Sequence, residues 1–257
     1  MKSMILLLCL LQGMPLGSPQ TSISTCGSPV SGSEFWYKAD AGVTCSGACS
    51  NGSSVTSWAD QSGNSRTATT ASGTLTFSTS QLNSLPAITS AGSAWATIGG
   101  STIGASDKHS VFIVWNNTLA GGARGIMGGP SADNTITVYT NVGLGSFGFC
   151  YDTSVTTFGN CTSTGTTVST WYQGNILQRG PASGSGSLIQ FRVNESPISL
   201  AGGGNNLNVN PPELIFAYSA SLHTFVGSIA EIIYYSTDLS GGDVTTNETY
   251  LHCRYGI

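Results

Sequence analysis

The chain has 257 residues, of which only 8% are charged, and its 8 basic and 12 acidic residues give a formal net charge of −4. The basic residues are scattered and form no stripe that could follow phosphates, which argues against a nucleic-acid partner. Hydrophobic residues make up 39% of the chain and aromatic residues 9%. This is enough to build a core, so we expect one folded domain rather than a disordered chain.

The N-terminus has the pattern of a signal peptide. Lys2 precedes an apolar stretch over residues 4–11, which is too short to cross a bilayer, and small residues follow it. We expect residues 1–18 to be removed, with cleavage as late as about residue 25, and residues 26–257 to form the domain. No other segment is long and apolar enough to span a membrane, so the sequence predicts a secreted protein.

Short apolar runs alternate with Gly, Ser, Asn and Pro clusters along the rest of the chain, which is the pattern of an all-β protein. The expected strands cover residues 35–38, 55–58, 94–98, 109–115, 125–127, 135–140, 146–151, 170–177, 187–193, 213–218 and 225–235. This spacing indicates a two-sheet antiparallel sandwich or jelly roll. Residues 111–115 are continuously apolar, as expected for a strand that is buried on both faces.

The chain ends in an apolar strand followed by a short helix. Ser240 stands three residues before Asp243, as in an N-terminal capping box. Val244, Leu251 and Tyr255 then fall on one helical face, and Gly256 is placed to end the helix.

Six of the seven cysteines lie in the mature chain, since Cys9 falls within the signal peptide. An even number suits disulfides in an oxidising compartment, and six cysteines allow fifteen pairings. The absence of a Cys-x-x-Cys motif, or of a histidine at ligand spacing, disfavours zinc. Sequence spacing favours the three pairs Cys26–Cys253, Cys45–Cys49 and Cys150–Cys161.

Several segments together carry a family resemblance. They are Phe-Trp-Tyr-Lys-Ala-Asp-Ala-Gly-Val at 35–43, Val-Thr-Ser-Trp-Ala-Asp-Gln-Ser-Gly-Asn at 55–64, Asn-Ser-Leu-Pro-Ala-Ile at 83–88, and the terminal strand and helix. Their order resembles the LamG-like jelly-roll domains of the concanavalin A-like lectin/glucanase superfamily. The resemblance implies an all-β, two-sheet antiparallel jelly roll over residues 26–257 with a short C-terminal helix.

The chain departs from that family pattern at two places. Asn194-Glu195 occupies a hairpin position that often holds Asn-Gly, which weakens the prediction of a tight two-residue turn. Asn247 lies where the terminal helix usually packs an apolar residue, so we expect this helix to depend on Cys253 for its attachment.

Glycoside hydrolysis is the enzymatic hypothesis that the resemblance suggests, and it requires two carboxylates facing each other across the sugar bond. No two acidic residues stand at i and i+2 on one strand. Glu231 lies on a strong strand but has no such partner, so we interpret it as a structural residue that bonds locally. The chain also lacks a Gly-x-Ser-x-Gly elbow, and His109, His223 and His252 have no motif context, with His252 expected to be exposed. We therefore expect binding rather than catalysis.

Calcium is the cofactor that the resemblance allows, because lectin-like sandwiches often carry it at loop ends. Its oxygen ligands would come from Asp, Asn and backbone carbonyls. The candidates are Asp60, Asp133, Asn134 and Asn205, although they form no recognisable loop motif.

A carbohydrate site needs an exposed aromatic ring to stack on the sugar and nearby polar groups to bind its hydroxyls. We expect Trp58 and Trp115 to be core residues, and core is also favoured for Trp36, Trp95 and Trp171. Tyr139 and Tyr151 lie beside polar loops and are expected to be more exposed. The predicted ligand-binding residues are Asp133, Asn134, Tyr139, Tyr151 and Asn205.

The sequence predicts a secreted binding domain for a glycan or an extracellular polymer. A glycoside hydrolase and a structural, self-associating surface protein remain alternatives. Asn-x-Ser/Thr sequons occur at Asn51, Asn116, Asn160, Asn194 and Asn247, and a eukaryotic source would make them glycosylation acceptors.

Overall fold

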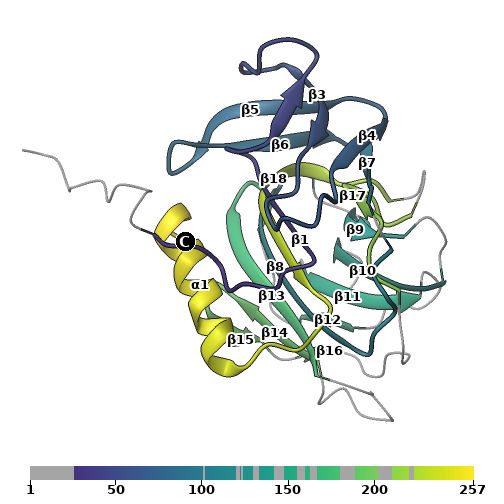
Figure 1. Ribbon diagram of the computed structural model, residues 1–257, viewed down its shortest axis with the longest axis vertical. Coiled ribbons are helices and arrows are strands. Elements are labelled where there is room, and N and C mark those ends of the chain that lie inside the picture. Colours follow the sequence, from purple (N-terminus) through teal and green to yellow (C-terminus); the bar gives the residue numbers. More distant parts are fainter. Residues whose placement is uncertain are drawn as a thin grey trace, which may run out of the picture.

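The computed structural model describes most of the chain beyond residue 25. The described residues are 26–100, 102–119, 122, 124–129, 133–141, 148–154, 160–162, 167–179, 189–198, 200–201, 210–219 and 223–257. The predicted signal peptide lies outside them. Antiparallel strands form two layers, and a single described helix lies against the outside of one layer (Figure 1). The predicted all-β sandwich with a C-terminal helix is confirmed.

The back layer is built around the long strand β18 (Val226–Tyr235). On one side it pairs with β8 (Lys108–Asn117), and on the other it pairs with β6 (Leu85–Ala91) and then β1 (Phe35–Lys38). The layer continues outward from β8 through β13 (Trp171–Arg179), β14 (Ile189–Val193) and β15 (Ser196–Ile198).

The front layer contains mostly shorter strands. Its order is β3 (Ser54–Trp58), β4 (Ala68–Ser72), β7 (Trp95–Ile98), β17 (Leu214–Ile215), β9 (Arg124–Gly128), β10 (Asp133–Asn141), β11 (Gly148–Ser154), β12 (Asn160–Thr162) and β16 (Leu200–Ala201). β2 (Val43–Cys45) pairs with β3. β5 (Leu75–Leu82) pairs with both β3 and β6, so hydrogen bonding passes from one layer to the other.

The main core lies between the two layers, and a second apolar cluster lies between the back layer and the helix. β8 shows why both exist: Val111, Ile113 and Trp115 face the main core, whereas Phe112 and Val114 face the helix. This strand is buried on both faces, as the continuous apolar run predicted. Trp58 and Trp115 are core residues as expected, whereas Trp36, Trp95 and Trp171 are only partly buried.

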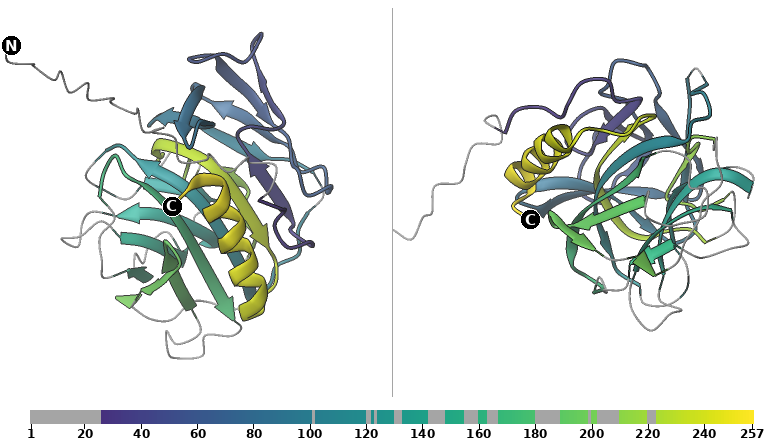
Figure 2. Two further views of the ribbon diagram at one scale, coloured as in Figure 1. Left: turned by 90° about the vertical axis from the view of Figure 1, so that its left-hand side faces the viewer. Right: turned by 90° about the horizontal axis from the view of Figure 1, so that it is seen from below.

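The helix α1 (Gly241–Tyr255) begins and ends where the sequence predicted. The Ser240 hydroxyl accepts a hydrogen bond from the Asp243 N–H at 3.2 Å and donates to the Asp243 carboxylate at 2.7 Å. Gly256 adopts the left-handed conformation (φ 71°) that ends the helix. Figure 2 shows α1 lying along the outer face of the back layer. His252 is exposed on it, as predicted. No described helix is long and apolar enough to cross a membrane.

The loop after β3 covers the free edge of β1. Asp60 accepts a hydrogen bond from the Trp36 N–H at 2.9 Å, and the Gln61 N–H donates to the Trp36 carbonyl at 2.7 Å. The Trp58 indole donates to the Lys38 carbonyl at 3.0 Å, and the Asn64 amide donates to the Ser33 carbonyl at 2.9 Å. The Trp-Ala-Asp-Gln-Ser-Gly-Asn segment therefore forms hydrogen bonds with backbone groups at the edge of β1. Without it, this edge would be open to pairing with a strand of another chain.

The hairpin at Asn194-Glu195 corrects an expectation from the sequence. Both residues have positive φ (47° and 63°), and Val193 pairs directly with Ser196, so the turn is a tight two-residue turn of type I′. Asn tolerates the left-handed region, and its Oδ1 accepts a hydrogen bond from the Gln173 N–H at 3.0 Å. A glycine at the second position is not needed here.

The two described disulfides agree with the predicted pairing. Cys26 is bonded to Cys253 and Cys45 to Cys49. Cys150 and Cys161 are direct partners in the β11–β12 register, but their side chains lie outside the described residues, so the third bond stays a prediction.

Asn247 has a different role from the one expected. Its side chain is completely buried; its Oδ1 accepts a hydrogen bond from the Val30 N–H at 2.9 Å, and its Nδ2 donates to the Tyr235 hydroxyl at 3.2 Å. The polar residue that weakened the helix prediction therefore attaches α1 to the N-terminal segment.

The two disulfides should differ sharply in what they contribute to stability. Replacing Cys26 and Cys253 by serine removes a link across 227 residues, and chain entropy predicts a loss of about 5 kcal/mol of unfolding free energy. The matched Cys45→Ser/Cys49→Ser variant opens a loop of only 4 residues and should lose about 2 kcal/mol. Denaturant unfolding measures both values. Equal losses would show that loop length does not set these contributions.

Candidate functional site

A pocket of about 210 Å³ lies where β7 ends and β17 begins. Its polar lining comes from Arg66, Thr102, Asn210 and Glu213, and its apolar lining includes Ile98 and Ile103. Pro211 and Pro212 form part of the same wall. The pocket combines charged, amide and hydroxyl groups with apolar surface, which is the mixed lining expected of a small-molecule site.

Backbone hydrogen bonds hold the two loops of this pocket in place. The Ile98 N–H donates to the Glu213 carbonyl at 2.8 Å, and the Glu213 N–H donates to the Gly128 carbonyl at 2.8 Å. Gly100 has φ 95°, and a Cβ at this position would lie 3.1 Å from Cγ of Arg66. The glycine therefore allows its loop to lie directly against the arginine.

Arg66 is fixed at this pocket by several contacts. Its guanidinium forms an ion pair with Glu34 at 3.1 Å, and its N–H donates to the Asp60 carboxylate at 3.1 Å. The Tyr37 hydroxyl donates to its carbonyl. Because its side chain is only 8% exposed, Arg66 presents a preorganised positive charge rather than a flexible one.

A row of hydroxyl side chains runs across the front layer next to this pocket. Thr44 pairs with Ser57, Ser57 with Thr69, and Thr69 with Thr97, which is followed by the pocket residue Ile98. Neighbouring strands are about 4.8 Å apart. The alternating residues of these strands face the main core, so the row, here called the hydroxyl row, faces solvent.

Trp95 lies two residues before Thr97 and therefore on the same face of β7. Its ring is partly exposed. None of the strands β2, β3, β4 and β7 contains an Asp, Glu, Lys or Arg. The surface beside the pocket is thus a neutral face of hydroxyl groups with one indole.

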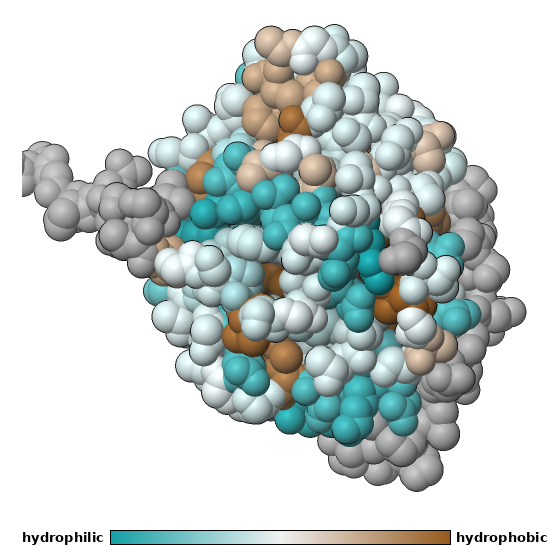
Figure 3. Space-filling view, in the orientation of Figure 1, coloured by the Kyte–Doolittle hydropathy of each residue, from teal (hydrophilic) through white to brown (hydrophobic). Residues whose placement is uncertain are grey.

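The described surface carries no broad apolar patch. Leu119, at 40%, is the one exposed large hydrophobic residue among the described parts of the chain. In Figure 3 the hydrophobic residues reach the surface only as small separate patches among polar ones.

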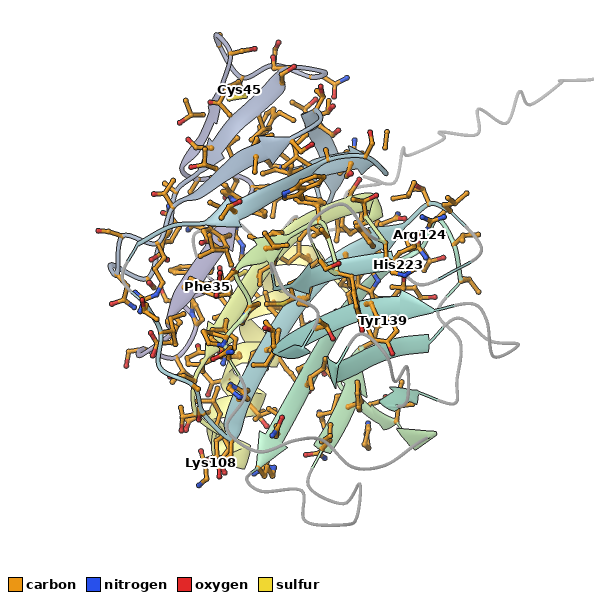
Figure 4. All side chains as sticks on the ribbon, turned by 90° about the vertical axis from the view of Figure 1, so that its right-hand side faces the viewer. Phe35, Cys45, Lys108, Arg124, Tyr139 and His223 are labelled. Carbon is orange, nitrogen blue, oxygen red and sulfur yellow. A yellow bond between two sulfur atoms is a disulfide. The ribbon has the colours of Figure 1, made fainter. Side chains whose placement is uncertain are left out.

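Tyr139 was wrongly expected to be exposed. It is completely buried in β10, and its ring packs edge-on against Tyr218, with 5.4 Å between ring centroids (Figure 4). The chain at Tyr218 comes this close because Gly125 and Gly128 have no side chains: a Cβ on Gly128 would lie 1.9 Å from the Tyr218 carbonyl oxygen. The sequence around Tyr139 does not show that it is buried, because Tyr218, which covers its ring, lies far away in the sequence.

Asp133 and Asn134 begin β10 close to the pocket in the backbone register. The next residue, Thr135, bridges Asn210, and the Ile136 N–H donates to the Asn210 carbonyl at 3.0 Å. Their side chains, like that of Tyr151 in β11, lie outside the described residues, as does all of Asn205. Their roles in ligand or calcium binding remain predictions.

The carboxylate of Asp60, a candidate calcium ligand, accepts hydrogen bonds from the loop that covers β1 and from β1 itself. One carboxylate oxygen accepts from the N–H groups of Trp36 and Ser62, at 2.9 and 2.8 Å, and the other accepts from the Ser62 hydroxyl and the Arg66 N–H, at 2.8 and 3.1 Å. Within the described ranges, no three His, Cys, Asp or Glu residues gather where they could hold a metal ion.

Glu231 is structural, as interpreted from the sequence, but its partners are not local. It is completely buried, and Trp36, Tyr250 and Tyr255 donate hydrogen bonds to it at 2.6 to 2.8 Å. Arg254 lies 3.3 Å from its carboxylate. Burial raises the pKa of the Glu231 carboxyl above its ordinary value, although Arg254 and the three donors lower it.

Glu248 is held in the same helix–sheet interface. Its carboxylate accepts hydrogen bonds from Asn175 at 2.7 Å and from Arg192 at 2.5 Å. Like Glu231, it is nearly inaccessible to solvent. These two carboxylates attach α1 to the back layer and do not reach the pocket.

No family model and no curated protein sequence matches this chain. Among solved structures, the fold is similar to an arabinofuranosidase in complex with arabinofuranosyl-α-1,2-xylobiose, with a TM-score of 0.59 and 12% identity. That match covers 89% of this chain, which spans only 60% of the arabinofuranosidase chain.

Two further structures show the same fold. Domain 4 of an extracellular arabinanase from Geobacillus stearothermophilus, in complex with arabinotriose, matches with a TM-score of 0.57 and 11% identity over 85% of this chain and 98% of the domain. Botulinum neurotoxin type C, whose cell entry depends on interaction with two ganglioside molecules, matches with a TM-score of 0.55 and 10% identity over 87% of this chain and 52% of the toxin chain. At these identities the comparisons show that the chain shares a β-sandwich fold with these proteins, and nothing finer.

The pH dependence of stability should report on His109. This histidine is buried, its Nδ1 accepts from the Tyr234 hydroxyl at 2.9 Å, and its Nε2 lies 2.8 Å from the Ser106 carbonyl. Burial lowers its pKa from 6.5 to about 4. The unfolded chain therefore binds the proton more strongly, and stability present above pH 6.5 should fall by about 3 kcal/mol as the pH drops to 4.

The matched measurement compares urea unfolding of the native chain and of His109→Gln at several pH values. Glu231 contributes with the opposite sign, because its raised pKa favours the folded state as the pH falls, but it is present in both proteins and cancels in the difference. We expect the native chain to lose stability more steeply than the variant. Parallel curves would contradict the assignment to His109.

Proposed function

We propose that this protein is a secreted, non-catalytic binding domain of the LamG-like jelly-roll type, and that its ligand is a neutral glycan. The observation that carries the proposal is the mixed pocket at Arg66 and Glu213, which continues into the neutral hydroxyl row beside Trp95. An uncharged face with many hydroxyl groups suits a ligand that is itself uncharged and rich in hydroxyls.

The pocket offers the two kinds of contact that a sugar requires. Arg66 and Glu213 supply charged donors and acceptors, which make stronger hydrogen bonds to hydroxyls than neutral groups do. Pro211, Ile98 and Ile103 supply apolar surface for the C–H face of the ring. Trp95 provides an aromatic ring on the adjoining face, where a further sugar unit could stack.

The positions of the carboxylates support binding over hydrolysis. A glycosidase needs two carboxyl groups roughly 5–9.5 Å apart across the scissile bond. Glu213 is the one carboxylate in the described lining of the pocket. Glu231 and Glu248 are buried under α1, where a substrate has no access to them.

The structural comparisons support the same class of ligand. Arabinotriose is bound by the arabinanase domain, which corresponds to this chain over 98% of its length. The neurotoxin interacts with gangliosides. We extend carbohydrate binding to this chain as a proposal, because the shared feature is the fold.

Export supports an extracellular polymer as the target. Disulfides persist in oxidising compartments, and this chain forms two among its described residues. The N-terminal pattern of a positive residue followed by a short apolar stretch is typical of a secretory leader.

The proposal is tested by screening the purified protein on a glycan array and measuring the best ligand by calorimetry. Glu213→Gln should weaken binding roughly 10-fold or more, because it removes a charged hydrogen-bond acceptor. Glu195→Gln, an exposed glutamate on the β14–β15 turn, is the matched control and should bind as the native protein does. Trp95→Ala should weaken the binding of longer oligosaccharides more than that of short ones, because the second sugar unit would lose its stacking partner.

Two results would contradict this function. One is the absence of binding to any neutral glycan. The other is the release of reducing sugar from the bound polysaccharide, which would favour a glycoside hydrolase. Equal losses for Glu213→Gln and Glu195→Gln would show that the pocket is not the site.

A further inference from the structure

The sequons of this chain differ in how the structure uses the asparagine side chain. N-linked glycosylation needs a solvent-accessible Nδ2, whereas Oδ1 is free to keep a hydrogen bond. The two ends of each amide can therefore be considered separately. Asn116 is half-buried inside β8, and the side chain of Asn160 lies outside the described residues, so neither is assigned.

Asn51 lies at the turn of the β2–β3 hairpin, which projects at the top of Figure 1. It is exposed, and its Oδ1 accepts a hydrogen bond from the Thr79 N–H at 3.1 Å. Its Nδ2 makes no hydrogen bond to any described residue. The backbone contact therefore uses only the oxygen of the amide.

Asn194 shows the same arrangement at a distant place. It is the exposed first residue of the β14–β15 turn, and its Oδ1 accepts from the Gln173 N–H at 3.0 Å. The Nδ2 of Asn194 forms no hydrogen bond with any residue in the described part of the chain. Ser196 completes the sequon at the start of β15 and is also exposed.

Asn247 has the opposite arrangement. Its side chain is completely buried, and both amide atoms are used, Oδ1 by Val30 and Nδ2 by Tyr235. A glycan on this nitrogen would break the contact with Tyr235 and prevent α1 from lying on the back layer. Cells that modified this residue would produce a chain that cannot complete the fold.

We infer that Asn51 and Asn194 are acceptor sites for N-linked glycans and that the folded protein carries none at Asn247. The donor is a lipid-linked diphosphate oligosaccharide. A bond forms between Nδ2 and C1 of the first sugar, the C1–O bond to the diphosphate breaks, the lipid diphosphate leaves, and the amide loses one proton. The inference rests on the proposed export and applies to a eukaryotic source, since the transfer takes place in the secretory pathway.

The experiment produces the full chain in cultured eukaryotic cells and maps glycans on the protein recovered from the medium. Enzymatic release of glycans in heavy-oxygen water marks each former site for mass spectrometry. We expect labelled peptides at Asn51 and Asn194 and an unlabelled peptide at Asn247. Asn51→Asp and Asn194→Asp retain the Oδ1 acceptor, so each variant should lose one glycan and keep the native melting temperature.

The possible outcomes separate the inference from the export proposal. Secreted protein that is unmodified at Asn51 or Asn194, or labelled at Asn247, would overturn the inference and leave export standing. A chain retained in the cytosol with residues 1–18 still attached would overturn export, and this inference with it. Loss of both glycans from either single variant would also contradict the inference, because each site is expected to carry its own glycan.

Discussion

The buried carboxylate of Glu231 is the interaction on which the arrangement of the fold depends. It lies in the central strand β18 and binds side chains from β1 and from α1, so a single group fixes three elements that are far apart in sequence. A buried charge is costly unless it is paired and fully hydrogen-bonded, and removing one partner of such a pair typically costs about 3–5 kcal/mol. Arg254 completes the pairing and also binds Asp40 at 2.8 Å. The helix is therefore held in one position, where apolar packing alone would allow it to slide.

A second chain of polar contacts leads from β1 to the candidate site. Asp60 binds the edge of β1 and also the backbone of Arg66, whose guanidinium is paired with Glu34 just before β1. The same loop thus protects a strand edge and positions a charged residue at the pocket. The Trp-Ala-Asp-Gln-Ser-Gly-Asn segment, which is one of the segments that carry the family resemblance, therefore also helps to position the lining of the candidate site.

The sequence predicted the parts of the fold that are determined by local patterns. The continuous apolar run at Val111–Trp115 and the capped terminal helix are examples, because burial on both faces and capping residues leave clear signals. The strands β4 and β5 were missed because their Ser- and Thr-rich sequences alternate only weakly in hydrophobicity, and β6, a mostly apolar run that contains Pro86, was missed as well. Tyr139 was misplaced for another reason: Tyr218, which covers it, is distant in sequence. The pocket residues Arg66 and Glu213 carry no motif, and only Pro211-Pro212 and Gly99-Gly100 marked the loops that bring them together.

The Cys26–Cys253 bond has a mechanical consequence. It joins the beginning of the described chain to the last turn of α1, so the covalent path between the two ends is short and bypasses both layers of the sandwich. Tension applied through the segments outside these two cysteines is carried by the sulfur–sulfur bond, while the strands between them remain unloaded. Pulling on the two chain ends would therefore not shear the sheets of the sandwich, and the resistance of the domain to such a pull would be set by the redox state of its surroundings.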